Sequence, residues 1–261
     1  MNKSEIIALY TQDQRIDVEY LDSRRDVTPT IVRHTDILGS GANTVLYSQL
    51  DETNVANAIQ EQIAFFENYC QEFEWKVYDY DTPPDLKDRL AAFGFEIEEV
   101  EAIMVLDLAA APEFLLQPIR PTIKKVTDPK QLEDVYLVEQ QVWQSDQSHL
   151  EAYLPRFVTE HPEYMSIYVA YADDRPASTA WVYFPPHSQF ASLWGGSTLK
   201  EYRQRGLYTA LLAVRLQEAK QRQVNYLTVD ASPMSRPILE KFGFEMIAMS
   251  YPCKWKASTN G

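Results

Sequence analysis

The feature that constrains the fold most is a short segment that occurs twice, once in each half of the 261-residue chain. The sequence LAAFGFEI at residues 90–97 is followed 149 positions later by LEKFGFEM at residues 239–246. At the same offset, Asp81 matches Asp230. The expected elements follow one order in both halves: a helix, a strand, a short helix, the FGFE segment and a further strand. Self-similarity at a fixed offset is typical of a duplicated structural unit.

The repeat predicts two domains, residues 1–115 and residues 116–261, joined by a proline-containing linker over residues 109–121. Both lengths fall in the usual range for one domain. With 45% apolar and 12% aromatic residues, the chain can build a sizeable core. In the first half, the pattern of apolar residues predicts a helix over residues 54–69 and a strand over residues 73–80.

The second half is predicted to be mixed α/β, because apolar residues recur at helical spacing in some segments and alternate in others. The sequence ADDRP at residues 172–176 predicts the turn of a hairpin. Gly195 and Gly196 interrupt the third strand, where glycine often marks a bulge. The predicted strands span residues 122–128, 165–172, 178–184, 190–199, 224–230 and 244–254, and the predicted helices span residues 131–143, 149–160, 207–221 and 234–242.

The net charge of −14 resides in the first half of the chain. Residues 1–115 contain 8 Lys and Arg against 23 Asp and Glu, whereas residues 116–261 contain 16 against 15. Such an acidic surface repels a phosphate backbone, and we therefore expect no nucleic-acid partner. Solubility is the plainer interpretation of the charge, and attraction of cationic substrates is the alternative.

We expect a cytoplasmic protein without a membrane partner. The first residues, MNKSEIIALYTQDQ, lack the apolar core of a signal peptide, and the apolar run AIMVLDLAAA is too short to span a bilayer. Cys70 and Cys253 form no CxxC pair, which argues against a zinc site or a disulfide scaffold. The four histidines have no metal-binding spacing, so no metal is expected. The segment 39–41, Gly-Ser-Gly, is interpreted as a hairpin turn.

Arg203, Arg205 and Gly206 stand at the start of a predicted helix, within a basic segment, residues 200–222. The first N–H groups of a helix lack partners in the helix and, with the helix dipole, favour an anion. Glycine lets the backbone approach a phosphate, and the arginines add positive charge. The segment can therefore hold a pyrophosphate. Taken alone, it is better explained as a routine helix start with solvated arginines.

Over residues 119–256 the order of elements resembles that of the Gcn5-related N-acetyltransferases, the GNAT family. RQRGLY at residues 203–208 resembles the family's Q/R-x-x-G-x-G/A motif, and LEKFGF at residues 239–244 resembles its YEKLGF motif. The resemblance implies a tandem GNAT fold of class α/β (α+β), with a mixed central sheet flanked by helices. The first half is expected to be truncated and degenerate, because residues 54–57, NVAN, stand where the second half has its phosphate motif.

The resemblance implies acetyl-CoA as the acyl donor and no metal. The pyrophosphate of acetyl-CoA would lie on the helix-start N–H groups, and the pantetheine would run along the third strand. The acceptor amine would attack the thioester directly, with a strand N–H at the oxyanion and a base for the ammonium proton. The implied cofactor-binding residues are Gly196, Ser197, Thr198, Arg203, Gln204, Arg205, Gly206, Leu207, Tyr208, Thr209 and Ser232.

Asp230 is the implied base, since it ends the strand beside the expected acyl group. A structural role in capping the next helix is the slightly better interpretation of the same residue. Ser235 is assigned to catalysis, and Ser232 or Ser235 can equally be a plain N-cap.

Two positions depart from the family's pattern. Tyr208 replaces the last small residue of the phosphate motif, so its ring must find room. Leu239 replaces the tyrosine that protonates the leaving thiolate, and the remaining donors are Tyr208, Tyr226, Tyr251 and Ser235. A thiol has a pKa of ~8.5, so its anion leaves tolerably well near neutral pH.

These observations predict an acetyl-CoA-dependent N-acetyltransferase that acts on a primary amine of a small molecule or a protein, as a monomer or homodimer. The alternative is a non-catalytic acyl-CoA-binding or protein-interaction protein, which Leu239 and the missing first-half motif favour. Binding of CoA without turnover would distinguish the alternative from the enzyme.

Overall fold

The computed structural model of the chain describes residues 2–37, 43–145 and 147–256. The segment 39–41, which the sequence predicts to be a hairpin turn, lies outside the described residues. Within the described part of the chain, no helix is both long enough and apolar enough to cross a bilayer.

The chain folds into two compact units. The first unit contains the residues up to 104 together with residues 230–240 and the residues from 245 onward, and the second contains residues 105–229 and 241–244. These units do not coincide with the two stretches of sequence that the repeat defines, because the last strand of the chain folds with the first unit. The division into residues 1–115 and 116–261 remains a prediction about the repeat.

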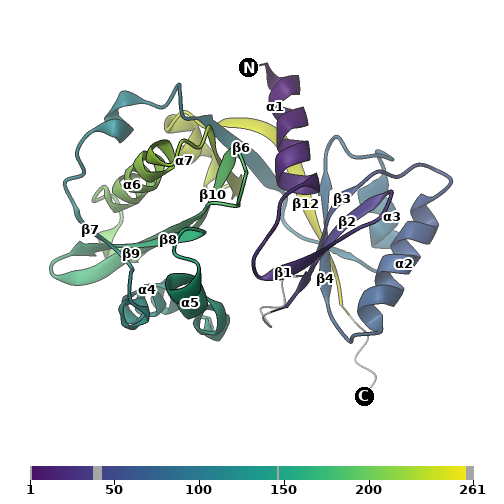
Figure 1. Cartoon of the computed structure of the whole chain (residues 1–261), viewed down its shortest axis with the longest axis horizontal. Helices are drawn as coiled ribbons and strands as arrows, with labels where there is room; N and C mark the ends of the chain where they lie inside the picture. The colour runs from purple at the N-terminus through teal and green to yellow at the C-terminus, as the bar shows by residue number, and fades with distance from the viewer. Residues whose placement is uncertain (1, 38–42, 146, 257–261) are drawn as a thin grey trace. The chain divides into compact units, whose positions relative to one another are not determined.

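The strands of the first unit lie in the order β1-β2-β3-β4-β12-β6. β3 is parallel to β4, and β12 is antiparallel to β4. Figure 1 shows α2 and α3 on one face of these strands. The elements are α1 (Lys3–Tyr10), a π-helical turn (Thr11–Ile16), β1 (Ser23–Val27), β2 (Ile31–Asp36), β3 (Thr44–Ser48), α2 (Val55–Glu67), β4 (Phe73–Tyr78), α3 (Leu86–Ala92), β5 (Glu96–Ile97), β12 (Glu245–Trp255) and β6 (Glu101–Asp107), which begins in this unit and ends in the second.

The core of the first unit lies between α2 and the strands. α2 buries Val55, Ile59 and Phe66, which recur at helical spacing along one face. The ring of Phe66 stacks on that of Phe73 in β4 at 4.3 Å between centroids. Trp75 is fully buried beside them. The predicted helix over residues 54–69 and strand over residues 73–80 are thus present, each slightly shorter than expected.

The two aspartates that the repeat aligns each bind a buried cation. Asp81 accepts two hydrogen bonds from the guanidinium of Arg15, at 2.7 and 2.8 Å, and Arg15 is fully buried. Asp230 pairs with the ammonium of Lys76, which also lies 3.5 Å from Glu101. Burial alone would lower the pKa of Lys76, but the carboxylates of Asp230 and Glu101 raise it above its ordinary value. Both pairs belong to the first unit.

The strands of the second unit lie in the order β6-β11-β10-β9-β8-β7, with β10 parallel to β11. Helices α4 and α5 cover one face of these strands and α6 covers the other (Figure 1). The elements are a 3₁₀ turn (Glu113–Leu116), β7 (Thr122–Lys125), α4 (Leu132–Trp143), α5 (Ser148–Glu160), β8 (Met165–Ala172), β9 (Arg175–Tyr183), β10 (Phe190–Thr198), α6 (Leu207–Gln221) and β11 (Tyr226–Ala231), which ends in the first unit. The short helix α7 (Arg236–Lys241) lies in the first unit except for Lys241.

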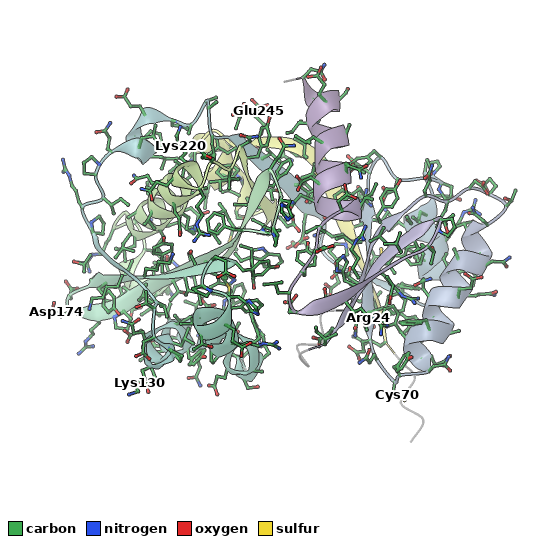
Figure 2. All side chains as sticks on the ribbon, in the orientation of Figure 1. Arg24, Cys70, Lys130, Asp174, Lys220 and Glu245 are labelled. Atoms are coloured by element: carbon green, nitrogen blue, oxygen red, sulfur yellow. The ribbon has the colours of Figure 1, made fainter. Side chains whose placement is uncertain are left out.

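The predicted elements of the second half are all present, with ends shifted by a few residues. Asp174, with a positive φ of 58°, lies at the tip of the β8–β9 hairpin, as the ADDRP sequence predicts (Figure 2). On α6, Lys220 donates a hydrogen bond of 2.8 Å to the carbonyl of Leu108 (Figure 2). This bond holds the chain that leaves β6 against the end of α6.

The repeat in the sequence corresponds to a repeat in local structure. Each copy has two parallel strands joined by a helix, β3-α2-β4 in one and β10-α6-β11 in the other. In both FGFE segments the glycine ends a short helix in the left-handed region, with φ of 92° at Gly94 and 86° at Gly243. The phenylalanine that follows, Phe95 or Phe244, is buried.

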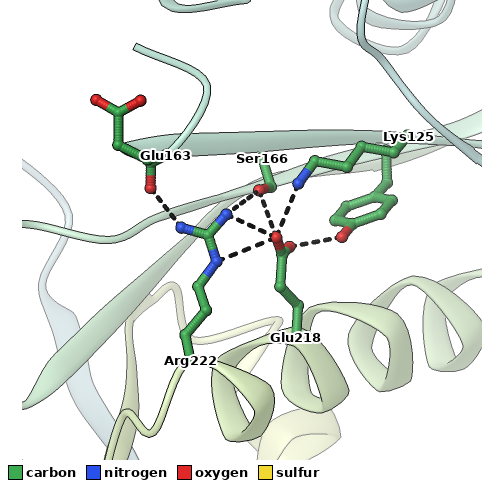
Figure 3. Close-up of polar contacts among 6 residues, drawn as sticks. Lys125, Glu163, Ser166, Glu218 and Arg222 are labelled. Carbon is green, nitrogen blue, oxygen red and sulfur yellow. Dashed lines mark hydrogen bonds and ion pairs between the residues drawn. The ribbon is translucent and has the colours of Figure 1, made fainter.

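A polar network joins α6 to the strands beneath it (Figure 3). The carboxylate of Glu218 accepts hydrogen bonds from Lys125 at 2.8 Å, Ser166 at 2.9 Å and Tyr168 at 2.5 Å. Arg222, one turn along the helix, adds a further bond at 2.8 Å. Burial alone would raise the pKa of Glu218, but the hydrogen bonds from Lys125, Tyr168 and Ser166 outweigh it and lower the pKa.

Replacing Glu218 with Gln should destabilise the protein by about 2 kcal/mol, because four donors lose their charged acceptor. The pKa of Glu218 is lower in the folded state, so its contribution is fully present above the unfolded pKa of ~4.3 and is lost as the pH falls through the folded value. Urea denaturation of both proteins should therefore show a gap at pH 7 that closes on acidification. Glu160→Gln, which breaks an exposed pair with Arg156, is the control and should cost less than ~0.5 kcal/mol. A gap that widens in acid would contradict the assignment.

Candidate functional site

The site is organised by a bulge in β10. Trp194 pairs with Trp181 of β9, but the next pair joins Ser197 to Thr179, so β10 contains one extra residue. Gly195 lies in the left-handed region with φ of 62°, and a Cβ there would lie 2.0 Å from the ring of Trp181. Conformation and space both require glycine at this position. The irregularity that the sequence predicts is thus confirmed.

Before the bulge, β10 separates from its parallel neighbour, β11. The pairs between β10 and β11 run from Phe190 with Tyr226 to Ser192 with Thr228, and none follows among the described residues of these strands. Near the point of separation, the hydroxyl of Thr228 is buried and has no hydrogen-bond partner in the described part of the chain. Pairing between β10 and β11 therefore ends at Ser192 and Thr228, and an orphaned polar atom lies at that last pair.

A buried arginine of α6 braces the bulge from one face. Arg215 donates hydrogen bonds to the carbonyls of Trp181 at 3.2 Å and Trp194 at 3.4 Å, one on each strand. It also bonds the carbonyl of Leu211 on its own helix. Burial lowers the pKa of Arg215 to about 10, so it still carries its charge at neutral pH.

The loop before α6 presents free backbone donors. Gln204 and Gly206 both have positive φ, at 62° and 79°, and Gly206 is the N-cap of α6. The first bond of the helix runs from the N–H of Ala210 to the carbonyl of Gly206, so the N–H groups of Leu207, Tyr208 and Thr209 have no partner within the helix. No acidic side chain lies in the first turn. This helix start favours an anion.

The two arginines of the loop are held differently. Arg205 makes a bidentate pair with Asp173 at 2.9 and 3.1 Å, and both side chains are exposed. Hydrogen bonds from Arg205 lower the pKa of Asp173. Arg203 donates a bond of 3.3 Å to the carbonyl of Thr198 at the end of β10. Arg203 is therefore held at the end of β10, whereas the charge of Arg205 is partly neutralised by Asp173 at the surface.

Tyr208 finds room because β10 has a glycine opposite it. A Cβ on Gly196 would lie 3.3 Å from the Tyr208 ring, and the other side of that ring packs against Phe242 at 6.1 Å between centroids. Burial raises the pKa of Tyr208. The departure from the small-residue motif is thus accommodated by packing. Tyr208 is also the alternative proton donor that lies beside the bulge.

On the opposite face, a buried carboxylate of α4 reaches the same strand. Glu139, 2% exposed, accepts hydrogen bonds from the hydroxyl of Ser197 at 2.9 Å, from the indole of Trp143 at 2.9 Å and from the hydroxyl of Thr179. Burial raises the pKa of Glu139, although these hydrogen bonds act in the opposite direction. Ser197, predicted to bind cofactor, is therefore already bonded on its α4 side.

Glu139 and Arg215 are not among the residues that the motifs predict. Each lies on the apolar face of a predicted helix, seven residues after Leu132 and four after Leu211. A charged residue at an otherwise apolar helical position was the signal that could have identified both.

Three further predicted residues, Asp230, Ser232 and Ser235, belong to the first unit. Asp230 pairs with Lys76, and within the described part of the chain it makes no capping bond to α7. Ser232 accepts a hydrogen bond of 3.3 Å from the N–H of Ser235, and the Ser235 hydroxyl donates to the carbonyl of Ser232. These local bonds are those of an N-cap, which was one of the two interpretations of the serines. No group of three or more His, Cys, Asp or Glu that could hold a metal occurs in the described residues.

Residues 130–244 match the family model described as "Acetyltransferase (GNAT) family". Among solved structures, a GCN5-related N-acetyltransferase from Kribbella flavida is similar with a TM-score of 0.68 and 14% identity, covering 97% of this chain and 93% of that one. A functionally unknown conserved protein from Staphylococcus epidermidis ATCC 12228 has a TM-score of 0.70 and 13% identity, with 91% and 96% covered.

A tandem GNAT protein from the clavulanic acid biosynthesis pathway has a TM-score of 0.63 and 14% identity, covering 94% of this chain and 86% of that one. No curated protein matches the chain. At these identities the structural similarity is one of fold.

Replacing Gly195 with Ala should destabilise the protein by about 3 kcal/mol, because the new Cβ overlaps the Trp181 ring and the backbone has a positive φ. Gly206→Ala is the matched control. Gly206 also has a positive φ, but no atom lies within 4 Å of the new Cβ. The substitution should therefore destabilise the protein by only about 1 kcal/mol. Thermal unfolding of the two variants checks the difference. Equal losses would show that the contact with Trp181 does not fix the bulge.

Proposed function

Because residues 130–244 match the acetyltransferase (GNAT) family model, we propose that the chain is an N-acetyltransferase that uses acetyl-CoA to acetylate a primary amine. The family supports an acyl-CoA-dependent acyltransferase in general terms, and the acetyl donor and amine acceptor are our proposal. The predicted α/β fold with a mixed central sheet is confirmed, and the tandem GNAT protein named above shares it across most of the chain.

The observation that carries the proposal is the start of α6, with its unpaired N–H groups, next to the strand β10, which is no longer paired with β11 after Ser192. The unpaired N–H groups and the open space at Gly206 fit an anionic group, and the orphaned hydroxyl of Thr228 fits a polar one. Acetyl-CoA, when bound, supplies an acyl group activated as a thioester. The residues proposed to hold it are Gly196, Ser197, Thr198, Arg203, Gln204, Arg205, Gly206, Leu207, Tyr208, Thr209 and Ser232.

The start of α6, the backbone of β10 and the nearby arginines have distinct tasks in this proposal. The N–H groups of the first turn of α6 and the Arg203 guanidinium bind the pyrophosphate. Beyond Ser192, the backbone of β10 is released from β11 and is available to donate a hydrogen bond to a developing oxyanion. Arg215 keeps that backbone in place through the two carbonyls at the bulge.

Proton transfer is proposed to involve Asp230 as base and Ser235 as a donor near the leaving sulfur, with Tyr208 as the alternative donor. The ion pair with Lys76 weighs against Asp230. Protonating its carboxylate would leave the buried ammonium with Glu101 as its remaining close carboxylate. The acceptor is proposed to be an amine of a small molecule or a protein, and the enzyme a cytoplasmic monomer or homodimer.

A second function, acyl-CoA binding without turnover, is favoured by Leu239. This side chain is buried and apolar, so it has no proton to donate. The bonds of Ser235 to Ser232 and of Asp230 to Lys76 favour the same interpretation. Release of free CoA from acetyl-CoA in the presence of amines would exclude it.

Titration of acetyl-CoA into the purified protein by calorimetry tests the proposal. We expect saturable binding, and a loss of affinity of about 100-fold or more when Gly206→Asp is combined with Arg203→Ala. The change removes one charged hydrogen-bond donor and places a carboxylate at the anion site, each worth ~1.5–3 kcal/mol.

Arg156→Ala, which removes an exposed arginine of α5, is the control and should bind as the unaltered protein does. Circular dichroism establishes that the double variant is folded. Absence of binding by the unaltered protein, or equal binding by the double variant, would overturn the cofactor assignment.

A further inference from the structure

Glu139 is a buried carboxylate with only neutral partners. Its three donors are two hydroxyls and an indole, and no Lys, Arg or His pairs with it among the described residues. A buried carboxylate without a cation is unfavourable, and such groups are more often found at sites that bind or react with a ligand. The position on the inner face of α4 could have been filled by an apolar residue like its neighbours Val135 and Val138.

The carboxylate lies beneath the bulge, on the face of β10 opposite the helix start. Successive residues of a strand point to opposite faces. Gly196 faces Tyr208 of α6, whereas the hydroxyl of Ser197 donates to Glu139 of α4. A group bound to Glu139 would therefore approach the bulge from the side away from α6.

Trp143 covers this carboxylate from outside. It follows Glu139 by one helical turn, and its indole N–H donates to Glu139 at 2.9 Å and lies 3.1 Å from the Ser197 hydroxyl. Although its N–H is engaged, the residue is 63% exposed. An indole ring next to a carboxylate is a favourable place for an organic ammonium ion, which donates to the anion and lies against the ring.

We propose that Glu139 and Trp143 bind the ammonium group of the acceptor, and that the substrates are cationic amines with no carboxylate next to the amine. This inference rests on the proposed function and adds the substrate class. The ammonium replaces the indole N–H as donor to the carboxylate, and Trp143 moves to place its ring against the ligand. An α-amino acid is excluded, because its carboxylate would face Glu139.

The test is a titration followed through the indole ¹H–¹⁵N signal of Trp143, assigned as the signal that Trp143→Phe removes. The probe is 2-phenylethylamine, which is an ammonium ion at neutral pH, and 2-phenylethanol is its neutral counterpart. We expect the amine to shift the signal saturably, and the alcohol to leave it unchanged. An unchanged signal with both probes, or an equal shift with both probes, would contradict the proposal.

Glu139→Gln keeps the shape and removes the charge, and should weaken binding of the amine about tenfold or more. Glu133→Gln, an exposed glutamate on the same helix, should bind the amine as the unaltered protein does. Equal affinity of Glu139→Gln and Glu133→Gln would overturn the proposal. The comparison of amine with alcohol uses the unaltered protein, so it decides the question even if Glu139→Gln does not fold.

The titration needs no acetyl-CoA, so its outcome is separate from the calorimetric test of the cofactor. If the enzyme acetylates 2-phenylethylamine, Glu139→Gln should raise the KM for the amine at least tenfold and leave the KM for acetyl-CoA unchanged. A variant that raises both KM values equally would point to a structural role for Glu139 and would contradict the proposal.

Discussion

The contact between Gly195 and the Trp181 ring fixes the bulge around which the candidate site of the second unit is arranged. The Trp181 indole fills the space beside residue 195. The residue of β10 at this position must therefore lack a Cβ and adopt the left-handed conformation. The extra residue is then retained as a bulge, and it sets which face of the sheet each following side chain meets. Gly196 faces α6, and Ser197 faces α4. Tyr208 of α6 and Glu139 of α4 therefore meet β10 on opposite faces directly after the bulge.

Buried charges of opposite sign flank the bulge. Arg215 lies on the α6 face and is bound by carbonyls alone, while Glu139 lies on the α4 face and is bound by neutral donors alone. Neither is neutralised by an ion partner among the described residues, so each leaves an electric field across the strand. In the proposed reaction, CoA leaves as a thiolate anion and the acceptor amine arrives as an ammonium cation. Arg215 would attract the anion on the α6 face of the strand, and Glu139 would attract the cation on the α4 face. In the proposed reaction, the bulge is where these two sides meet.

Sequence patterns predicted the second unit well, because its helices and strands have strong apolar periodicity and clear turn residues. The bulge and the helix start of α6 were found from Gly195, Gly196 and Gly206, whose positive φ or close contacts make glycine necessary. The start of the chain was not predicted. α1 buries only Ile6 and Tyr10, and a helix so short leaves too weak a pattern to recognise.

The partners of individual charges could not be predicted from the sequence. Asp230 was interpreted as a base or a cap, but its partner, Lys76, is 154 residues away in the sequence. Glu139 depends on Ser197 and Thr179, which come from two strands of the sheet. Such contacts are set by the topology of the sheet, which periodicity along the chain does not specify.

The placement of β12 has a consequence for how such a gene can evolve. This strand, encoded at the end, completes strands encoded near the beginning, and Asp230 neutralises a lysine from the other copy of the repeat. A fragment that kept only the later copy would carry β12 without β4 and the Asp230 carboxylate without its cation. Either copy could diverge in sequence after the duplication, as the earlier one has at its phosphate motif. Neither could be deleted or transferred alone, so selection must act on the two copies as one inherited unit.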